Sequence, residues 1–343
     1  MSMPVWEEFV DLEDYNTFRV KSTARYLVRI QSPDIGQLVR SARFQNHRHF
    51  ILGSGSNILL AHRTYDGIVL KNEIPGIDIV SQHGIYTTLK VGGGVIWDSL
   101  VTHCIKNRLG GIENLSMIPG TVGAAPIQNI GAYGVEVGDV IESVQVVDTR
   151  TGKARSVPKA ECDFGYRDSA FKHELRGCLI TSVTIKLTNA NHYRPTLTFD
   201  SIKKILEVQG SLEPTIQSVS DAVRFIRRQK LPALNEIGNA GSFFVNVVVD
   251  ASMYQGMNNL HPYLPSFPAL NGSKIIPAAW LIEKCGWKGV QLGRVGVYAH
   301  NALVLVNFGG AKGGEIIELS DRIIQDVEHR FGMKLRLEVN IVL

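Results

Sequence analysis

One glycine-rich stretch constrains this chain more than any other feature. Residues 110–138 contain seven glycines and two prolines, together with the amide side chains of Gln128 and Asn129. Glycine and proline at this density interrupt helices and strands, yet the stretch is too apolar for an exposed linker. A structureless segment longer than about 15 residues is usually functional or disordered. The stretch therefore predicts a buried loop that shapes a ligand site.

The composition is that of an ordinary folded protein. The chain has 343 residues, of which 44% are hydrophobic and 20% charged, as is typical of globular proteins. This length predicts two or three domains, because a single hydrophobic core stops growing at smaller sizes. The net charge of +4 suits anionic small molecules and falls short of the basicity of nucleic-acid-binding proteins. We interpret the densest basic group as a solvated helix face, formed by Arg224, Arg227, Arg228 and Lys230.

Missing patterns exclude several classes of protein. The four cysteines show no paired spacing, which argues against a disulfide framework and a zinc site. The ten histidines include no His-Glu-x-x-His motif, so we expect no metal. No apolar run of about 18 residues occurs, and the acidic N-terminus lacks the pattern of a secretory signal. We therefore expect a cytoplasmic protein without a membrane segment.

Apolar periodicity predicts a mixture of helices and strands. The first two strands flank a glycine turn, and residues 149–152 form the turn of a hairpin. A polar connection at 188–198 precedes a domain boundary near residue 213. The predicted strands are 50–52, 67–71, 86–91, 140–148, 154–157, 178–187, 302–306 and 335–343, and the predicted helices are 96–107, 199–208, 220–229, 278–285 and 314–331.

A second glycine motif, Gly53-Ser54-Gly55-Ser56-Asn57, directly follows the predicted strand 50–52. Without Cβ atoms in the way, backbone N–H groups can turn toward an anion such as a pyrophosphate. The spacing matches neither the dinucleotide-binding fingerprint nor the P-loop. Taken alone, the motif is equally compatible with a plain tight turn.

Several motifs together resemble bacterial UDP-N-acetylenolpyruvoylglucosamine reductases. The FAD-binding half of that family is matched, in order and spacing, by Asn16-Thr17-Phe18, Gly53 to Asn57, Gly110 to Gly134, and Phe164-Gly165-Tyr166-Arg167-Asp168-Ser169. The C-terminal half is matched by Gly238-Asn239-Ala240-Gly241-Ser242-Phe243-Phe244 and Ala278-Ala279-Trp280-Leu281-Ile282-Glu283. The resemblance covers nearly the whole chain.

The resemblance implies an α+β fold of the PCMH type, which is similar to vanillyl-alcohol oxidase. In this fold two subdomains clasp FAD and a third domain closes over the substrate. We expect FAD-binding subdomain 1 at 1–75, subdomain 2 at 76–213 and an α+β substrate-binding domain at 214–332. The PCMH-type FAD region is expected at about 20–190, and the last strand, 333–343, is expected to return to the active site.

The resemblance also implies an activity. Such a flavoprotein oxidoreductase reduces UDP-N-acetylglucosamine enolpyruvate to UDP-N-acetylmuramate in peptidoglycan precursor synthesis, and so serves cell wall formation, cell shape and division. Hydride passes from NADPH through FAD to the enolpyruvyl methylene carbon, because a flavin can accept hydride and pass it on within one site. The implied cofactors are FAD and NADPH. We expect a monomer with small-molecule partners only.

Three residues match the family's catalytic positions. Arg167 suits a clamp for a carboxylate or enolate, because a guanidinium is permanently charged and donates two parallel hydrogen bonds. Ser242 matches the proton donor, a role that requires a dry, positively charged pocket. Glu338 matches the active-site glutamate and follows Arg336-Leu337, where the family usually has Glu-Pro. The alternatives are a surface salt bridge for Arg167, a capping serine for Ser242 and an exposed strand glutamate for Glu338.

The family's binding residues carry over to two sets of positions. The FAD contacts are Gly53, Ser54, Gly55, Ser56, Asn57, Pro119, Gly120, Thr121, Gly123, Ala124, Gln128, Asn129, Gly131, Ala132, Tyr133 and Gly134; the substrate contacts are Tyr166, Lys230, Asn246, Asn301, Phe199 and Phe267. Relatives often carry tyrosine at the last two positions, so stacking on uracil is retained and a phenolic hydrogen bond is lost. Residues 193–199 imply the subclass with a mobile substrate-covering loop.

Two other functions use the same glycine motifs. Another FAD oxidoreductase of this fold, acting on a sugar or hydroxy acid, needs a base that removes a proton. A nucleotide-sugar-binding protein without catalysis does not need Arg167, Ser242 and Glu338 together. Hydrolysis is not supported, because Ser242 lacks the Gly-x-Ser-x-Gly elbow.

Overall fold

The computed structural model describes residues 5–211 and 213–343. Residues 1–4 and 212, which belong to the predicted subdomains 1–75 and 76–213, lie outside the described part. The chain forms two compact units, each built from three segments: Met1–Val10, Thr23–Gly55 and Thr64–Arg228 in the first, and Asp11–Ser22, Ser56–Arg63 and Gln229–Leu343 in the second. The division into three domains stays a prediction.

The first unit contains a four-stranded sheet with the order β1 (Trp6–Asp11), β2 (Thr23–Ile30), β5 (Thr64–Asn72), β3 (His49–Leu52). The predicted strands 50–52 and 67–71 are confirmed as β3 and β5, but they are parallel neighbours. A parallel pair needs a crossover longer than a glycine turn, and this crossover includes β4 (Ile58–Leu60). Two short helices, α1 (Gly36–Arg40) and α2 (Ala42–Gln45), connect β2 to β3.

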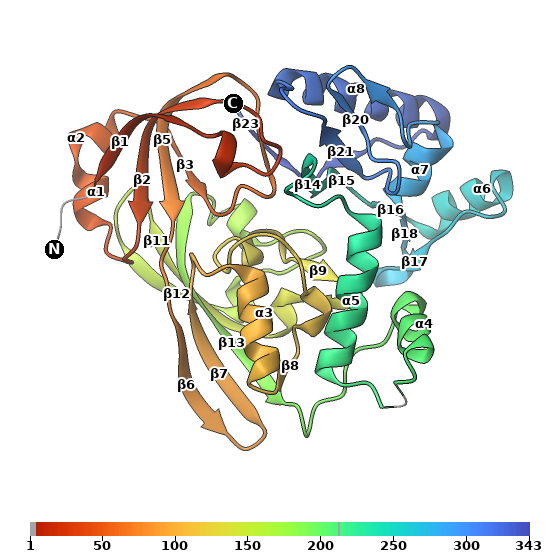
Figure 1. The fold of residues 1–343 in the computed structure, drawn as a ribbon, viewed down its shortest axis with the longest axis horizontal. Helices are drawn as coiled ribbons and strands as arrows, with labels where there is room; N and C mark the ends of the chain where they lie inside the picture. Colours follow the sequence, from red (N-terminus) through yellow and green to blue (C-terminus); the bar gives the residue numbers. More distant parts are fainter. Residues whose placement is uncertain (1–4, 212) are drawn as a thin grey trace. The chain divides into compact units, whose positions relative to one another are not determined.

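A larger antiparallel sheet completes the strands of this unit. Its order is β12 (Ala154–Pro158), β11 (Ile141–Asp148), β13 (Cys178–Asn189), β7 (Tyr86–Gly92), β6 (Ile77–His83), and β8 (Leu109–Gly110) also pairs with β13. The predicted hairpin is confirmed, and its turn closes where the Gly152 N–H donates to the Asp148 carbonyl at 2.8 Å. In Figure 1, β6 and β7 form a second, long hairpin.

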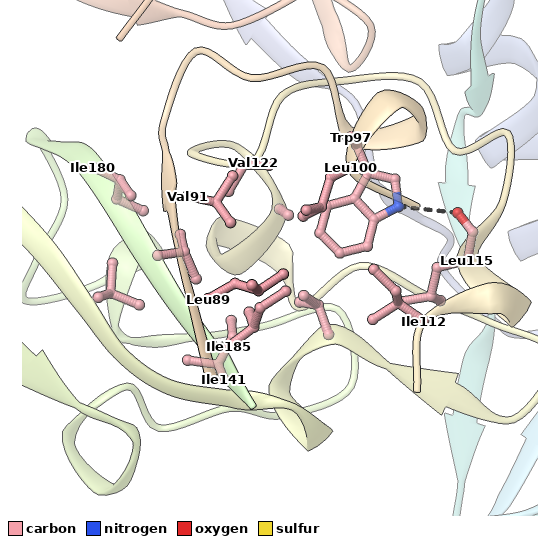
Figure 2. Close-up of a cluster of buried hydrophobic side chains, with 14 of the residues drawn as sticks. Leu89, Val91, Trp97, Leu100, Ile112, Leu115, Val122, Ile141, Ile180 and Ile185 are labelled. Carbon is pink, nitrogen blue, oxygen red and sulfur yellow. Dashed lines mark hydrogen bonds between the residues drawn. The ribbon is translucent and has the colours of Figure 1, made fainter. Parts of the chain in front are cut away.

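Helix α3 (Trp97–Lys106) buries one apolar face against this sheet (Figure 2). Its buried residues, Trp97, Leu100, Val101 and Cys104, recur at the spacing that the sequence predicted. Trp97 is only 1% exposed, and its indole N–H donates to the Leu115 carbonyl at 3.0 Å. This hydrogen bond ties the glycine-rich stretch to the hydrophobic core.

Replacing Trp97 by phenylalanine is expected to lower the free energy of unfolding by about 1–3 kcal/mol, because it leaves a small void and leaves the buried Leu115 carbonyl with only the long 3.4 Å hydrogen bond from the Ile118 N–H. Urea denaturation followed by circular dichroism measures the change. The matched control is Trp287→Phe, whose indole N–H bonds Asp326 at 2.8 Å at an exposed site. An equal loss in both variants would contradict the role given to the buried hydrogen bond.

The glycine-rich stretch is irregular, as predicted, apart from very short elements: η2 (Glu113–Leu115), η3 (Ala125–Gln128), β9 (Gly131–Ala132), β10 (Val135–Glu136) and η4 (Val137–Asp139). Its middle is fixed to the turn before α3, since the Gly123 N–H donates to the Gly93 carbonyl at 2.8 Å. A Cβ atom on Gly123 would lie 2.9 Å from that carbonyl oxygen, so only glycine allows this approach. The core therefore determines the path of the stretch.

Two helices follow the sheet, and the first unit ends within the second of them, at Arg228. Helices α4 (Asp200–Val208) and α5 (Ile216–Lys230) confirm the predicted helices, although α5 begins four residues earlier than position 220. The earlier start has two local causes. Ile216 is buried, and Thr215 and Ser218 exchange hydrogen bonds between their backbone N–H groups and hydroxyls.

The second unit combines several small sheets with three helices. One sheet has the order β14 (Gly238–Ser242), β21 (Val304–Asn307), β20 (Val295–Val297), β19 (Gln291–Leu292). Another has the order β16 (Val247–Val249), β18 (Lys274–Ile276), β17 (Phe267–Pro268). Two smaller sheets pair β15 (Phe244–Val245) with β22 (Arg336–Leu337), and β23 (Asn340–Val342) with β4. The helices are α6 (Ala251–Leu260), α7 (Ala278–Lys284) and α8 (Gly313–Phe331). Helices α7 and α8 and strand β21 confirm predicted elements.

The predicted terminal strand 335–343 is wrong as a single element. It forms two short strands with different partners: β22 pairs antiparallel with β15, and β23 pairs parallel with β4. Glu338 and Val339 lie between them. Across the described residues, none of the helices combines the length and hydrophobicity needed to traverse a bilayer.

Candidate active site

The two predicted FAD-binding motifs meet in the first unit. Gly53 follows β3, and a Cβ atom built on it would lie 2.7 Å from the Thr121 hydroxyl oxygen. The Lys71 ammonium, which the sequence did not single out, donates to the Gly53 carbonyl at 2.6 Å. Burial lowers the pKa of Lys71. The positive charge of Lys71 and the backbones of the two predicted FAD-binding motifs thus lie close together, at a place that suits a polar ligand.

Two buried hydroxyls at this place have no hydrogen-bond partner among the described residues. They are Ser54 Oγ and Thr121 Oγ1, one from each predicted FAD-binding motif. A buried hydroxyl without a partner costs about 1–3 kcal/mol, and buried polar groups in native proteins are usually satisfied. A hydroxyl can both donate and accept a hydrogen bond. These two residues therefore fit a bound phosphate group or a polar atom of a ring, both of which FAD would provide.

Asn129 organises the second half of the glycine-rich stretch. Its amide Nδ2 donates to Glu136 Oε2 at 2.7 Å and to the Gly165 carbonyl at 3.1 Å, and its Oδ1 accepts from the Gly138 N–H at 2.9 Å. Both amide hydrogens are therefore used within the protein. Its predicted contact with FAD stays a prediction, and the structure gives Asn129 a positioning role.

Arg167 occupies a strained turn beside the same stretch. Its φ of +56° is unusual for a residue other than glycine, and such strain is concentrated at functional sites. The turn is closed by the Gly165 N–H, which donates to the Asp168 carbonyl at 3.0 Å. The guanidinium lies 5.4 Å from the centre of the Tyr166 ring and donates to the Gly131 carbonyl at 2.8 Å. Tyr166 and Arg167 are thus held beside a predicted FAD-binding residue.

Glu136 is a charged neighbour of Arg167 that sequence reasoning missed. Burial raises the pKa of the Glu136 carboxyl, and the hydrogen bond from Asn129 and the charge of Arg167 oppose that rise. Arg167 belongs to a distant motif, so no local spacing pattern could have indicated that Glu136 is its neighbour.

The predicted substrate-covering segment 193–199 lies against the glycine-rich stretch. Asn114 Nδ2 donates to the carbonyls of Tyr133 and Thr196, each at 3.0 Å. The rings of Tyr133 and Phe199 meet edge to face with centroids 5.8 Å apart. Phe199, a predicted substrate contact, therefore packs on a predicted FAD contact. The mobility of the segment stays a prediction.

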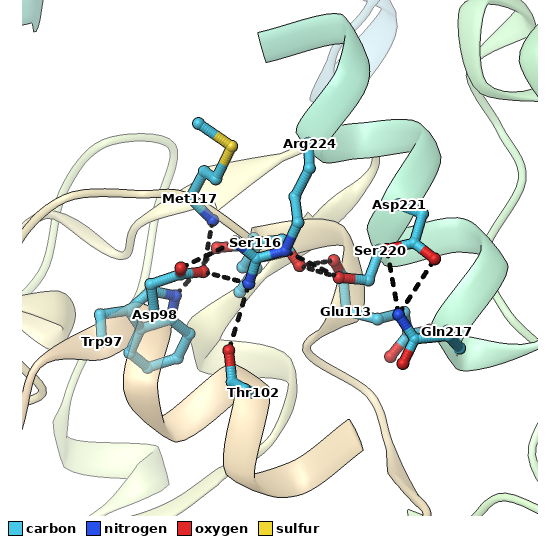
Figure 3. Close-up of polar contacts among 11 residues, drawn as sticks. Trp97, Asp98, Thr102, Glu113, Ser116, Met117, Gln217, Ser220, Asp221 and Arg224 are labelled. Carbon is cyan, nitrogen blue, oxygen red and sulfur yellow. Dashed lines mark hydrogen bonds and ion pairs between the residues drawn. The ribbon is translucent and has the colours of Figure 1, made fainter. Parts of the chain in front are cut away.

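Figure 3 shows a polar network that joins α5 to α3 and to the glycine-rich stretch. The Arg224 guanidinium donates to both Asp98 oxygens at 2.8 and 2.7 Å. Asp98 also accepts from the Met117 N–H, and the hydroxyls of Ser116 and Ser220 are hydrogen-bonded at 2.7 Å. Because the Arg224 side chain is only 20% exposed, its interpretation as part of a solvated helix face is wrong.

Ser242 ends strand β14 in the second unit. Gly241 before it has a φ of +68°, and its N–H donates to Asn239 Oδ1 at 3.0 Å. The pairing of β14 with β21 is irregular between Asn239 and Ser242. Irregularities of this kind redirect side chains and are frequent beside active sites.

Glu338 directly follows β22, the strand that pairs with β15 just after Ser242. Its backbone N–H donates to the carbonyl of Phe243 at 2.9 Å, and its carbonyl accepts from Asn57 Nδ2 at 3.1 Å. The structure thus brings together Ser242, Glu338 and Asn57, three residues predicted from distant motifs. Arg336 pairs with Val245 in β22, so the departure from the family's Glu-Pro sequence leaves a strand in place.

The remaining predicted substrate contacts are more dispersed within the second unit. Asn246 accepts from the Ala278 N–H at 3.0 Å, and it lines a cavity of about 220 Å³ together with Lys334 and Arg336. Phe267 is 45% exposed on β17.

Two further predicted contacts lie at the ends of elements. The Oδ1 of Asn301 accepts from the Leu303 N–H at 3.1 Å just before β21. Lys230 is the exposed last residue of α5. In the described part of the chain, no three His, Cys, Asp or Glu side chains form a group that could hold a metal ion.

Comparison with known proteins connects both units to one family. Residues 25–157 match the FAD binding domain model, and residues 232–342 match the C-terminal domain of UDP-N-acetylenolpyruvoylglucosamine reductase. The reductase of that name from Amoebophilus asiaticus is 42% identical over 341 residues, which cover 98% of this chain and 99% of the relative. The chain belongs to the UDP-N-acetylenolpyruvoylglucosamine reductase family. A second member, from Pseudomonas aeruginosa, is 41% identical and is covered to 98%.

Solved structures support the fold assigned to this reductase family member. The UDP-N-acetylenolpyruvylglucosamine reductase of Thermus caldophilus is 23% identical with a TM-score of 0.67, and the alignment covers 99% of each chain. A solvent-stable cholesterol oxidase is 12% identical with a TM-score of 0.50, and the alignment covers 98% of this chain and 87% of the oxidase. The predicted family, the α+β fold with an FAD-binding domain and the FAD cofactor are confirmed.

Proposed function

We propose that this protein reduces UDP-N-acetylglucosamine enolpyruvate to UDP-N-acetylmuramate with NADPH, in the cytoplasmic synthesis of peptidoglycan precursors. The observation that carries the proposal is the 42% identity to a named reductase across 98% of the chain. The protein acts on small molecules as a monomer. Bound FAD supplies the hydride acceptor and donor in one group.

The first unit provides the residues that would hold FAD and the arginine that binds the substrate's carboxylate. Gly53, Ser54 and Thr121 would hold the cofactor, because glycine lets the two motifs approach closely at Gly53 and the hydroxyls of Ser54 and Thr121 need partners. Arg167 stabilises the carboxylate and the enolate that develops next to it, since its planar fork matches two oxygens at once. Its hydrogen bond to the Gly131 carbonyl and its position over the Tyr166 ring orient the guanidinium.

The second unit provides the proton. Ser242 donates the proton from its hydroxyl to the carbon adjacent to the methylene, a transfer that requires a dry, positively charged pocket. Glu338, whose backbone N–H donates to the Phe243 carbonyl, supports the enolate. The backbone hydrogen bonds that fix Ser242 and Glu338 limit their freedom before the reaction.

An absorbance spectrum and a turnover assay test the proposed function. The purified protein is expected to be yellow with flavin bands, and to oxidise one NADPH for each UDP-N-acetylglucosamine enolpyruvate consumed. UDP-N-acetylglucosamine, which lacks the enolpyruvyl group, is the control and should cause no stoichiometric oxidation. A correctly folded protein, as judged by circular dichroism, that cannot take up FAD would overturn the proposal.

A further inference from the structure

Lys172 lies five residues after Arg167 and is bonded to its backbone. The Lys172 ammonium donates a hydrogen bond to the Arg167 carbonyl at 2.6 Å, and the lysine is half-buried. Because the donor is charged, this bond is stronger than one between neutral groups. Sequence reasoning did not single out Lys172, although it follows the predicted active-site motif closely. It is linked directly to the residue that would bind the substrate's carboxylate.

The Arg167 carbonyl belongs to a tight turn that runs from Gly165 to Asp168. The Asp168 N–H donates to the Gly165 carbonyl at 3.3 Å, and the opposite pair also bonds. Arg167 is the third residue of this turn, where a positive φ is usually supplied by glycine or asparagine. A φ of +56° in an arginine persists only when the surrounding contacts enforce it. The hydrogen bond from Lys172 is one such contact.

Lys172 is itself held by a buried base. It ends the 3-10 helix η6 (Ala170–Lys172), whose first two residues lie in the hydrophobic core beneath the large sheet. The hydroxyl of Ser169 caps this helix by accepting from the Phe171 N–H at 3.2 Å, and it donates to the Ile127 carbonyl at 2.7 Å. The helix is therefore fixed both to the core and to the glycine-rich stretch, so the lysine extends from a rigid point.

A second contact beside the turn is weaker. His173 and Asp168 form an ion pair at 2.9 Å, but their side chains are 57% and 49% exposed. Exposed ion pairs contribute little to stability. The other firm contact of Arg167 is at its side chain, where the guanidinium donates to the Gly131 carbonyl. Lys172 and Gly131 thus hold the two ends of the arginine, its backbone and its guanidinium.

We propose that Lys172 is a positioning residue whose ammonium holds the Arg167 backbone, so that the guanidinium fork faces the substrate's carboxylate and the enolate that develops from it. The proposal rests on the proposed function and adds a residue to its carboxylate clamp. The role is indirect, because the lysine is bonded to the backbone of Arg167. Losing the lysine should therefore impair the half-reaction that uses the substrate and spare the reduction of the flavin.

The test follows the flavin by stopped-flow absorbance in the FAD-bound enzyme. In Lys172→Met, reoxidation of the reduced flavin by saturating UDP-N-acetylglucosamine enolpyruvate should be about 10- to 100-fold slower, because a misplacement of about 1 Å can cost about 100-fold. Reduction of the flavin by NADPH should stay at the wild-type rate, since the clamp acts on the substrate. The absorbance spectrum of the bound FAD should also be unchanged.

Two single variants serve as controls. Lys172→Arg keeps a charged donor on a long side chain, so it should restore most of the reoxidation rate. Lys159→Met removes a bond of the same kind, from the Lys159 ammonium to the Asp139 carbonyl at 3.2 Å, at an exposed site of the same unit. It should leave both half-reactions unchanged. A Lys172→Arg enzyme as slow as Lys172→Met would overturn the positioning role.

A double variant separates positioning from an independent role of the lysine. Arg167→Met removes the guanidinium, so nothing remains for Lys172 to orient. Adding Lys172→Met to Arg167→Met should therefore cause no further loss of reoxidation rate, the non-additivity expected of residues that act as one unit. Losses that multiply in the double variant would refute the proposal.

Other outcomes are also decisive. A wild-type reoxidation rate in Lys172→Met overturns the proposal, and so do equal losses in both half-reactions, which indicate a general disturbance of the fold. If Lys172→Met does not fold, Lys172→Gln takes its place under the same criteria. Failure of the proposed function is a different result, because the reduced wild-type enzyme would then not be reoxidised by UDP-N-acetylglucosamine enolpyruvate at all.

Discussion

Replacing Ser242 by alanine is expected to slow the reoxidation of reduced flavin by UDP-N-acetylglucosamine enolpyruvate by about 1,000-fold, within the range for general acid catalysis. Reduction of the flavin by NADPH should stay near the wild-type rate, because that half-reaction needs no proton on the substrate carbon. Stopped-flow absorbance of the flavin measures the two half-reactions separately.

The control for this variant is Ser252→Ala, an exposed serine near the start of α6 whose hydroxyl bonds Asp250. It should leave both half-reactions unchanged. Equal losses in the two half-reactions of Ser242→Ala would contradict the proton-donor role, since a misplaced flavin would impair both.

Replacing Arg167 by lysine is expected to slow the same reoxidation by about 100- to 1,000-fold, comparable to the loss of one donor from an oxyanion site. Lysine keeps the charge and loses the planar pair of donors that matches a carboxylate. The φ of +56° at this position strains both side chains alike, so the turn itself should be little affected. Stopped-flow rates at saturating substrate isolate this chemical effect.

Arg155→Lys serves as the control for Arg167→Lys. Arg155 belongs to the same unit and pairs weakly with Glu161 at 3.8 Å on the surface, so its replacement should change neither half-reaction. A wild-type reoxidation rate in Arg167→Lys would show that charge alone is sufficient and would refute the need for a bidentate clamp.

Elements with strong periodicity could be predicted from the sequence. Helix α8 and helix α3 bury one face at regular spacing, and β13 is a long apolar run, so local residues determine them. The two-residue strands β15 and β22 could not be predicted, because each exists through pairing with a distant partner. The terminal segment illustrates this point: β22 and β23 separate because β15 and β4 lie elsewhere in the sequence.

Some residues of the candidate site could likewise be predicted from the sequence, and others could not. Motif resemblance indicated Arg167, Ser242 and Glu338, and the structure shows how strained turns and strand irregularities hold the first two. Motif resemblance could not indicate Glu136, whose charged neighbour Arg167 lies in a distant motif. Arginines at helical spacing are usually solvated, so sequence reasoning assigned Arg224 to the surface, whereas its partner Asp98 on α3 can be recognised only in three dimensions.

The backbone passes from one unit to the other five times, since each unit is assembled from three separate segments. No single cut in the gene can therefore yield either unit alone. A fragment starting at Gln229 would lack β4, the strand paired with β23, and the Phe18 carbonyl that accepts from Asn307 at 2.7 Å. Exchanging the second unit for that of a relative would therefore require three interleaved segments to be moved together, and the ribosome must finish the last strand before this unit is complete.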